Sequence, residues 1–356
     1  MYPALSVLSA LKKIESALKV LWVGGAGGME EDLVKRADIS FTAVPAAGVH
    51  GVGLRRLPRN VISLARGFFA ARSILCDYRP DLLFFTGGYV AVPVALAGRR
   101  LPKLLYTPDI EPALALKTIS YMADRIMVTT EDSRVYYSRP ESVVVSGYPA
   151  RSELTGWTVD AARQALDLRE DMPTLLVMGG SQGARSINLA MLNALEELLA
   201  DIQIVHISGQ LDWTRVEAAQ GRLPVELHSR YRPYKYLHEE MGAAFRVADL
   251  VISRAGASTL GELPLFGLPA VLVPYPHAWR YQHVNAQFLV ERGAAVVIND
   301  HELVDTLIPT IRSLLTDKDR LDGMKQAMRA LACPHAAETI AHNILDLAMT
   351  SCRKRM

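Results

Sequence analysis

Short apolar runs alternate along the chain with longer stretches in which apolar residues recur every three or four positions. The runs are typical of buried strands, and the longer spacing is typical of amphipathic helices. Residues 61–78, for example, have the helical spacing. Regular alternation of this kind predicts a parallel sheet covered by helices. In the first half, the expected strands are residues 19–24, 39–44, 81–88, 103–108, 125–130 and 142–147.

The same alternation begins again after residues 147–157, where Gly, Pro, Ser and Thr collect. We therefore expect an α/β fold with two Rossmann-like, doubly wound units. Ligands of such sheets bind at the carboxyl ends of the strands, so two facing units would form a cleft. The expected domains are 1–150, 151–340 and a helical tail at 341–356. The second set of expected strands is 174–180, 202–209, 225–231, 249–256, 270–276 and 294–300.

Composition narrows the class of protein. The chain has 356 residues, of which 50% are hydrophobic and 21% charged, so disorder is excluded. A net charge of +2 gives no sign of a nucleic-acid partner. Cys76, Cys333 and Cys352 lie far apart, without the spacing of a disulfide framework or a metal site. No apolar run reaches about 18 residues and no leader peptide is evident, which favours a cytoplasmic protein.

A Gly-rich turn follows the expected strand at 174–180 and has the sequence GGSQGAR at 179–185. Its glycines would let the backbone approach a ligand, Ser181 offers a hydroxyl, and the next helix would point free N–H groups at an anion. The turn is neither a Walker A motif nor a clean GxGxxG. The alternative is a strand-to-helix turn that simply requires glycine.

A second turn, SRAGASTLGE at 253–262, follows the expected strand at 249–256. Ser258 and Thr259 could cap the next helix, and Glu262 could accept hydrogen bonds from two ribose hydroxyls. A carboxylate that only stabilises the helix N-terminus is the alternative.

A third segment, 274–286, follows the expected strand at 270–276 and is rich in side chains that hydrogen-bond sugars. A polar loop that caps a helix would explain only one or two of them. In the first half, Gly87 and Gly88 follow another strand, although clustered glycines are more typical of a surface turn. The polar side chains of the third segment are His277, Arg280, Gln282 and Asn285.

Five segments stand in a fixed order: GGYVAVP at 87–93, GYPAR at 147–151, GGSQGAR at 179–185, SRAGASTLGE at 253–262 and HAWRYQHVNA at 277–286. This ordered set resembles the MurG family of bacterial glycosyltransferases, and the likeness runs from Tyr2 to about Ala348. The resemblance implies a GT-B fold and an inverting transferase without a metal or cofactor. Such an enzyme moves N-acetylglucosamine from UDP-N-acetylglucosamine to an undecaprenyl-linked muramyl-pentapeptide, and thereby makes lipid II for peptidoglycan.

The resemblance also implies roles for single residues. Ser181 would bind the donor diphosphate, and Arg151 would reach the uracil side of the nucleotide. Gln282 would contact the donor sugar, and the backbone around Leu237 would contact uracil. Glu262 would accept hydrogen bonds from the ribose. The segment that would wrap the diphosphate and ribose consists of Ala257, Ser258, Thr259, Leu260, Gly261 and Glu262.

The chain departs from the family at two places near the expected donor sugar. Tyr106 to Asp109 stand where MurG has His-Glu-Gln-Asn, so Asp109 replaces an Asn that would face the sugar. Tyr281 replaces the first residue of a Gln pair whose second residue is Gln282. The general base cannot be assigned from the sequence: the family's loop histidine is absent from these residues, and Asp109 is only a distant candidate.

The family has a strand and a Gly-rich loop ending in His directly before the position of Tyr2. We hypothesise that Met1 is an internal methionine and that translation starts upstream. Without the strand, the expected helix at 2–14 would lack its anchor and the sheet would have unpaired edges. Upstream codons without a strand and a Gly-Gly-His-like turn would contradict this hypothesis.

Residues 54–72 contain five arginines and no acidic residue, and Val61, Leu64, Ala65 and Phe68 share a helical face. This combination fits a basic and apolar membrane patch, for which we name Arg55, Arg59 and Phe68. An amphipathic helix whose apolar face packs on the core is the alternative. Because the implied acceptor carries a lipid, we expect peripheral binding to the inner face of the cell membrane.

Three other functions fit the same features. A UDP-sugar epimerase on the GT-B fold would turn over UDP-N-acetylglucosamine without a lipid. Another lipid-directed glycosyltransferase would use a different acceptor. A chain that holds a nucleotide-sugar without transferring it would bind UDP but make no product.

Overall fold

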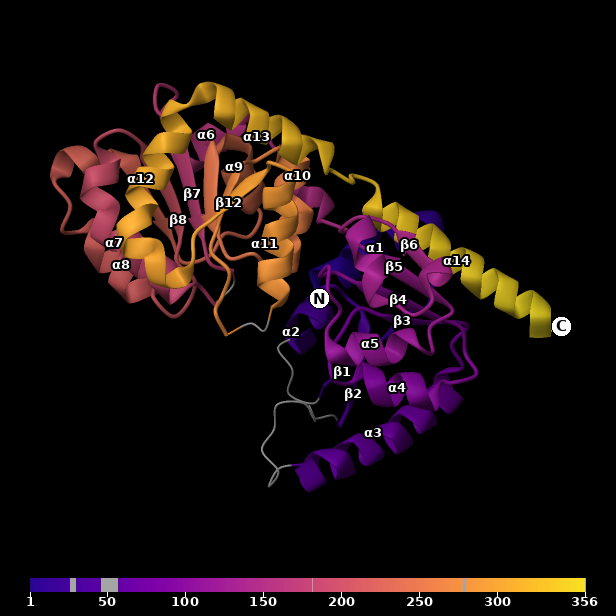
Figure 1. Ribbon diagram of the computed structural model, residues 1–356. Helices are drawn as coiled ribbons and strands as arrows, with labels where there is room; N and C mark the ends of the chain where they lie inside the picture. Colours follow the sequence, from indigo (N-terminus) through magenta and orange to yellow (C-terminus); the bar gives the residue numbers. More distant parts are fainter. Residues whose placement is uncertain (26–29, 46–56, 181, 278–279, 356) are drawn as a thin grey trace. The chain divides into compact units, whose positions relative to one another are not determined.

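The computed structural model describes residues 1–25, 30–45, 57–180, 182–277 and 280–355 (Figure 1). Within them the chain forms two units, each with its own core. Unit 1 contains Met1–Pro149 together with His335–Met356, and unit 2 contains Ala150–Pro334. The predicted α/β fold with parallel sheets in two units is confirmed.

The described strands of unit 1 are short, rich in β-branched and aromatic residues, and all parallel. Two of them, β1 and β2, form one pair, and the other four form a sheet of order β3-β4-β5-β6. The strands are β1 (Leu21–Gly25), β2 (Ser40–Val44), β3 (Leu83–Phe85), β4 (Lys103–Thr107), β5 (Arg125–Val128) and β6 (Val143–Val145).

Helices cover both faces of the four-stranded sheet. Leu104 and Tyr106 point to a core that includes α1 and α14, whereas Leu105 and Ile126 point to a core that includes α4 and α5. This burial on both faces explains why the strands read as continuous apolar runs. The helices of unit 1 are α1 (Tyr2–Ile14), α2 (Glu30–Arg36), α3 (Leu57–Tyr78), α4 (Ala91–Ala97), α5 (Leu114–Ser120) and α14 (Ala336–Arg355), with 3-10 turns η1 (Glu131–Tyr136) and η2 (Pro140–Ser142).

The last helix, α14, belongs to unit 1. Ile340 and Ala341 are fully buried there, in the same core as Val7 of α1. The boundary that we expected at residue 340 therefore falls inside a helix. We propose that the second domain ends instead at Pro334, where the structural unit ends.

Unit 2 is built on six parallel strands in the order β12-β11-β10-β7-β8-β9. Read from β9, this is the Rossmann order 3-2-1-4-5-6, with β7 as its first strand. The direction of winding reverses between β7 and β10. The strands are β7 (Thr174–Met178), β8 (Gln203–Ile207), β9 (Tyr231–Tyr234), β10 (Leu250–Ser253), β11 (Ala270–Leu272) and β12 (Ala295–Val297).

The core of unit 2 joins this sheet to the longest helices. Leu175 and Ile252 of the sheet lie in one apolar cluster with Ile187 of α7 and Ile311 of α12. The helices are α6 (Val159–Leu166), α7 (Arg185–Leu199), α8 (Trp213–Gln220), α9 (Met241–Val247), α10 (Glu262–Phe266), α11 (Tyr281–Glu291), α12 (Leu303–Thr316) and α13 (Lys318–Ala330), with 3-10 turns η3 (Ser152–Gly156), η4 (Val225–Arg230), η5 (Ala257–Leu260) and η6 (Asp300–Glu302).

One expected strand was wrong. We expected residues 225–231 to be extended, but Val225–Arg230 form a 3-10 helix and the strand begins at Tyr231. Val225 is 82% exposed, and of the apolar residues in this 3-10 helix only Leu227 packs against the core. The strand that follows lies at the edge of the sheet and contains Pro233, which an edge strand tolerates.

Candidate functional site

Two of the predicted motifs lie at the point where the sheet of unit 2 reverses its winding. The turn at 179–184 follows β7, and the turn at 254–261 follows β10. The two strands are direct neighbours, with Met178 beside Ser253 at their carboxyl ends. Sheets of this order bind ligands in the crevice at the switch point. The sequence motifs therefore meet where the fold itself predicts a ligand.

The turn after β7 comes close to neighbouring backbone. Gly183 has a φ of +89°, and a Cβ there would lie 2.1 Å from the carbonyl oxygen of Ser208. Only glycine fits this position without a shift of the backbone. The turn leads into the 15-residue helix α7, whose N-terminus favours an anion. Ser181 lies outside the described residues.

A buried polar network lies beneath this turn. Asn188 of α7 donates hydrogen bonds to the Ser208 carbonyl (2.9 Å) and to Asp212 (3.0 Å), and its amide oxygen accepts from Nε2 of His206 (3.0 Å). Nδ1 of His206 then accepts from the hydroxyl of Tyr231 (2.8 Å). Burial lowers the pKa of His206 to about 4, so the ring is neutral. The network fixes the Ser208 carbonyl against the Gly-rich turn.

The segment after β10 brings two expected nucleotide residues together. Glu262 begins α10, and its carboxylate Oε1 lies 3.7 Å from Nη2 of Arg151. The Glu262 side chain is 10% exposed and that of Arg151 is 22% exposed. Burial raises the pKa of Glu262 to about 7, and the charge of Arg151 acts in the opposite direction. A largely desolvated carboxyl of this kind can accept hydrogen bonds from a ligand hydroxyl without competition from water.

The rest of that segment is partly buried. Thr259, Leu260 and Gly261 are buried, and the Thr259 hydroxyl donates to the Gly256 carbonyl. The Thr259 side chain therefore holds the turn, and the buried Leu260 side chain leaves mainly backbone groups to meet a ligand. Ala257 and Ser258 are half-buried in the 3-10 turn η5.

Two amides of α11 connect the neighbouring turns. The side-chain oxygen of Gln282 accepts from the backbone N–H of Tyr275 (2.8 Å), which follows β11. Asn285 is fully buried and donates to the carbonyl of Ala255 (3.1 Å). The third motif thus lies at the same strand ends as the first two. Leu237, expected near uracil, is buried in the segment after β9.

Unit 1 places its own candidates at the carboxyl ends of β3 and β4, which are neighbouring strands. Gly87 and Gly88 have positive φ values and open space where a side chain would stand. Asp109 is half-buried just after β4. Tyr106, by contrast, is fully buried, and its hydroxyl hydrogen-bonds Thr129 (2.9 Å), so it belongs to the core.

Two residues of the expected membrane patch, Arg59 and Phe68, belong to α3. Arg55 and the side chain of Arg59 lie outside the described residues, and Phe68 is only half-buried rather than exposed. Among the described side chains of α3, the most exposed apolar ones are Ile62 (54%) and Phe69 (68%), which lie two turns apart on one face. Among the described helices, none is both long and apolar enough to cross a bilayer.

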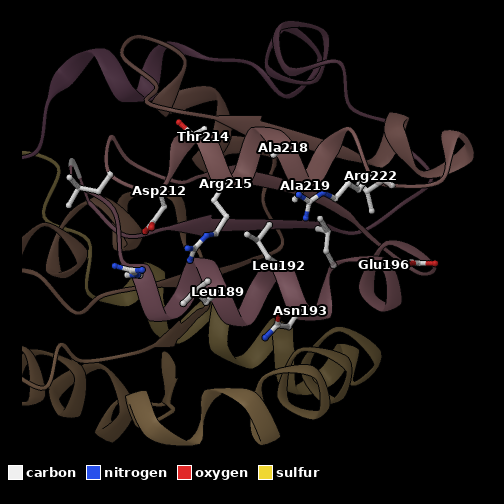
Figure 2. A pocket seen from close by; sticks show the side chains of 14 residues that line it. Leu189, Leu192, Asn193, Glu196, Asp212, Thr214, Arg215, Ala218, Ala219 and Arg222 are labelled. Atoms are coloured by element: carbon white, nitrogen blue, oxygen red, sulfur yellow. The ribbon is translucent and has the colours of Figure 1, made fainter.

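A groove of about 780 Å³ lies along α7 and α8 (Figure 2). Figure 2 shows Leu192 in the groove, with Arg215 and Arg222 on the side of α8. Neither Arg151 nor Glu262 lines it. Within the part of the chain that the structure describes, no cluster of His, Cys, Asp or Glu has the composition of a metal site.

The chain matches the Glycosyltransferase family 28 N-terminal domain over residues 1–128 and the Glycosyltransferase family 28 C-terminal domain over residues 174–340. Together with the two-unit parallel-sheet fold, these matches define a glycosyltransferase class. A relative from Roseiflexus sp. (strain RS-1) is 40% identical over 361 residues, which cover 90% of this chain and 82% of the relative. Its name is UDP-N-acetylglucosamine–N-acetylmuramyl-(pentapeptide) pyrophosphoryl-undecaprenol N-acetylglucosamine transferase. The chain belongs to this family, MurG.

Solved structures share the fold. The crystal structure of Acinetobacter baumannii MurG has a TM-score of 0.75 at 24% identity and covers 97% of this chain and 95% of its own. A putative UDP-N-acetylglucosamine 2-epimerase from Listeria monocytogenes reaches 0.69 at 15% identity, over 96% and 92%. The predicted GT-B fold is confirmed. Because an epimerase has the same fold, it is the sequence relationship that separates the two activities.

Proposed function

We propose that this protein transfers N-acetylglucosamine from UDP-N-acetylglucosamine to an undecaprenyl-linked muramyl-pentapeptide and so converts lipid I to lipid II. Membership of the family supports the reaction. The observation that carries the donor assignment is the ion pair of Arg151 and Glu262 beside the switch-point turns of unit 2.

In this proposal, different residues of unit 2 bind the diphosphate, the ribose, the uracil and the sugar of the donor. The N–H groups of the turn at 179–184 and of the α7 N-terminus bind the diphosphate, together with the Ser181 hydroxyl. Glu262 accepts from the ribose hydroxyls, and Arg151 and the Leu237 backbone contact the uracil side. Gln282 contacts the donor sugar. These roles follow from the family resemblance and agree with the positions of the described residues at one edge of one sheet.

The reaction is a displacement at the anomeric carbon with inversion. The acceptor hydroxyl attacks the carbon, the bond to the diphosphate breaks, and UDP leaves with the electron pair. Negative charge grows on the diphosphate, where the N–H groups of the turn and of α7 stabilise it. In unit 1, Asp109, which is half-buried just after β4, is a candidate for the general base that takes the proton of the attacking hydroxyl.

We also propose that α3 binds the inner face of the membrane, where the lipid-linked acceptor resides. Its exposed face combines the apolar Ile62 and Phe69 with the exposed arginines Arg66 and Arg72. Apolar side chains bind at the acyl boundary, and basic side chains are attracted to anionic headgroups. The protein would then act as a peripheral membrane enzyme.

The experiment that tests the proposed reaction compares UDP release with and without a lipid I analogue. A transferase releases UDP from UDP-N-acetylglucosamine only when the acceptor is present. Turnover of the nucleotide-sugar without acceptor would instead show an epimerase or a hydrolase. Binding of UDP without any turnover would show a nucleotide-sugar-binding protein.

A further inference from the structure

Arg254, in the turn after β10, is the centre of a closed set of polar contacts. One terminal nitrogen, Nη1, donates to Oδ1 of Asp300 and to the carbonyl of Val273 (3.1 Å). The other, Nη2, donates to the hydroxyl of Ser186 (2.7 Å). That hydroxyl in turn donates to the same Asp300 oxygen (2.7 Å). The three side chains thus form a ring of contacts in which each touches the other two.

Arg254 and its three partners follow four neighbouring strands. Ser186 is in the first turn of α7, which follows β7, and Arg254 itself follows β10. Val273 follows β11, and Asp300 comes after β12. These strands are adjacent in the sheet, in the order β12-β11-β10-β7. One guanidinium therefore joins the carboxyl ends of four strands, including those that carry the three predicted ligand-binding segments.

We propose that Arg254 is a positioning residue for the donor site, and that it holds the strand-end turns in the arrangement that binds the nucleotide-sugar. The inference rests on the proposed function of unit 2. A planar guanidinium suits this task, because its fixed fork of donors reaches a carboxylate, a hydroxyl and a carbonyl at once. The shorter-reaching ammonium of lysine cannot make all three contacts together.

The contacts of Arg254 argue against a direct role in binding the diphosphate. Its side chain is only 11% exposed, and both terminal nitrogens already donate to protein acceptors. Its charge is compensated by Asp300, whose side chain is 24% exposed. The guanidinium carbon of Arg254 also lies 5.3 Å from the centroid of the aromatic ring of Tyr275. A group held in this way orders the turns rather than meeting the ligand.

The two roles predict opposite effects of removing the carboxylate. If Arg254 acts through its contacts with Asp300 and Ser186, then Asp300→Asn loosens the same turns and weakens donor binding, as Arg254→Met does. If Arg254 binds the diphosphate directly, Asp300→Asn removes a competing anion and leaves donor binding unchanged or stronger. The sign of the Asp300→Asn effect therefore decides between them.

The test is calorimetric titration of the full chain with UDP-N-acetylglucosamine, for wild type, Arg254→Met, Asp300→Asn and the double variant. We expect each single variant to raise the dissociation constant about tenfold or more, the scale of small misplacements in a site. The double variant should be no weaker than the weaker single variant, because both remove one set of contacts. The KM for the donor should rise, whereas the KM for the acceptor stays as in wild type.

Arg230→Met is the matched control. Arg230 is also half-buried in unit 2 and donates to the carbonyls of Leu199 and Ala200, but it precedes β9 and so lies away from the carboxyl ends. It should leave donor binding unchanged. If the wild type binds the donor and Arg254→Met or Asp300→Asn binds it equally tightly, the inference is overturned but the proposed function is not. Absence of wild-type binding would overturn the proposed function and the inference with it.

Discussion

Glu262 and Arg151 face each other across 3.7 Å within unit 2, although they lie in different segments far apart in the chain. The carboxyl is buried, and its pKa is raised to about 7 because the loss of hydration outweighs the attraction of one guanidinium. This pair is therefore not an optimised stabilising ion pair. Its geometry suits a group that gains its full set of hydrogen bonds only when a ligand binds.

Glu262 should lower the stability of unit 2 as the pH rises. The folded state holds the proton more tightly than the unfolded state, where the pKa is near the ordinary 4.5. Its contribution is thus fully present below about pH 4.5 and is lost as the pH rises through about 7. The difference of two to three pKa units corresponds to about 3 kcal/mol.

Glu262→Gln removes this titration. Relative to wild type, the free energy of unfolding of the variant should increase by about 3 kcal/mol between pH 4 and pH 8. Urea unfolding at both pH values measures the change. Glu217→Gln, at an exposed position of α8, is the control and should show none. A constant difference between Glu262→Gln and wild type would contradict the raised pKa.

Loss of the Glu262 carboxyl should weaken UDP binding. Glu262→Ala removes the proposed acceptor of the ribose hydroxyls, so the binding free energy should fall by about 1–3 kcal/mol. Calorimetric titration with UDP measures it, with Glu217→Ala as the control variant. An affinity equal to that of wild type would refute the ribose role.

The Gly-rich turn should not tolerate a side chain at Gly183. Alanine there would adopt a φ of +89° and place its Cβ 2.1 Å from the Ser208 carbonyl oxygen. We expect Gly183→Ala to lower the free energy of unfolding by roughly 1–3 kcal/mol and to weaken UDP binding as well. Gly221→Ala is the matched control, because its Cβ would meet only an ordinary contact at 3.8 Å. Wild-type stability of Gly183→Ala would contradict the close approach of the two turns.

The exposed face of α3 should bind anionic vesicles. Replacing Arg66 and Arg72 with Gln removes two charges near the surface, each worth about 1 kcal/mol, so the partition coefficient should fall roughly thirtyfold. Vesicle sedimentation measures it. The same double change at Arg222 and Arg320 of unit 2 alters the net charge equally and should have little effect. If both double variants lower the partition coefficient equally, the effect is one of net charge, and α3 is not the membrane-binding surface.

The sequence was sufficient to predict the strands and the motifs because their signals are local. Apolar runs mark buried parallel strands such as β7 and β10, and glycine marks the tight turn at Gly183. The expected strand at 225–231 was wrong, because a run with apolar residues can also form an exposed 3-10 turn. Only the environment of Val225 distinguishes the two.

The contacts between distant segments could not be predicted. Family resemblance assigned Arg151 and Glu262 to one nucleotide, but their contact depends on how the start of α10 lies relative to the segment before α6. Similarly, nothing near Arg254 indicates that Asp300 and Ser186 come to it. Those contacts follow from the strand order of unit 2, and local patterns do not encode strand order.

The most direct test of the proposed function follows both products of one reaction. The full chain is incubated with UDP-N-acetylglucosamine, a lipid I analogue and vesicles. The mass of the acceptor is measured by mass spectrometry, and the amount of released UDP is measured in the same sample. We predict that the acceptor gains one N-acetylhexosamine for each UDP released, and that Glu262→Ala slows both equally. UDP release without an enlarged acceptor, or no release from a chain that binds UDP, would contradict the transferase assignment.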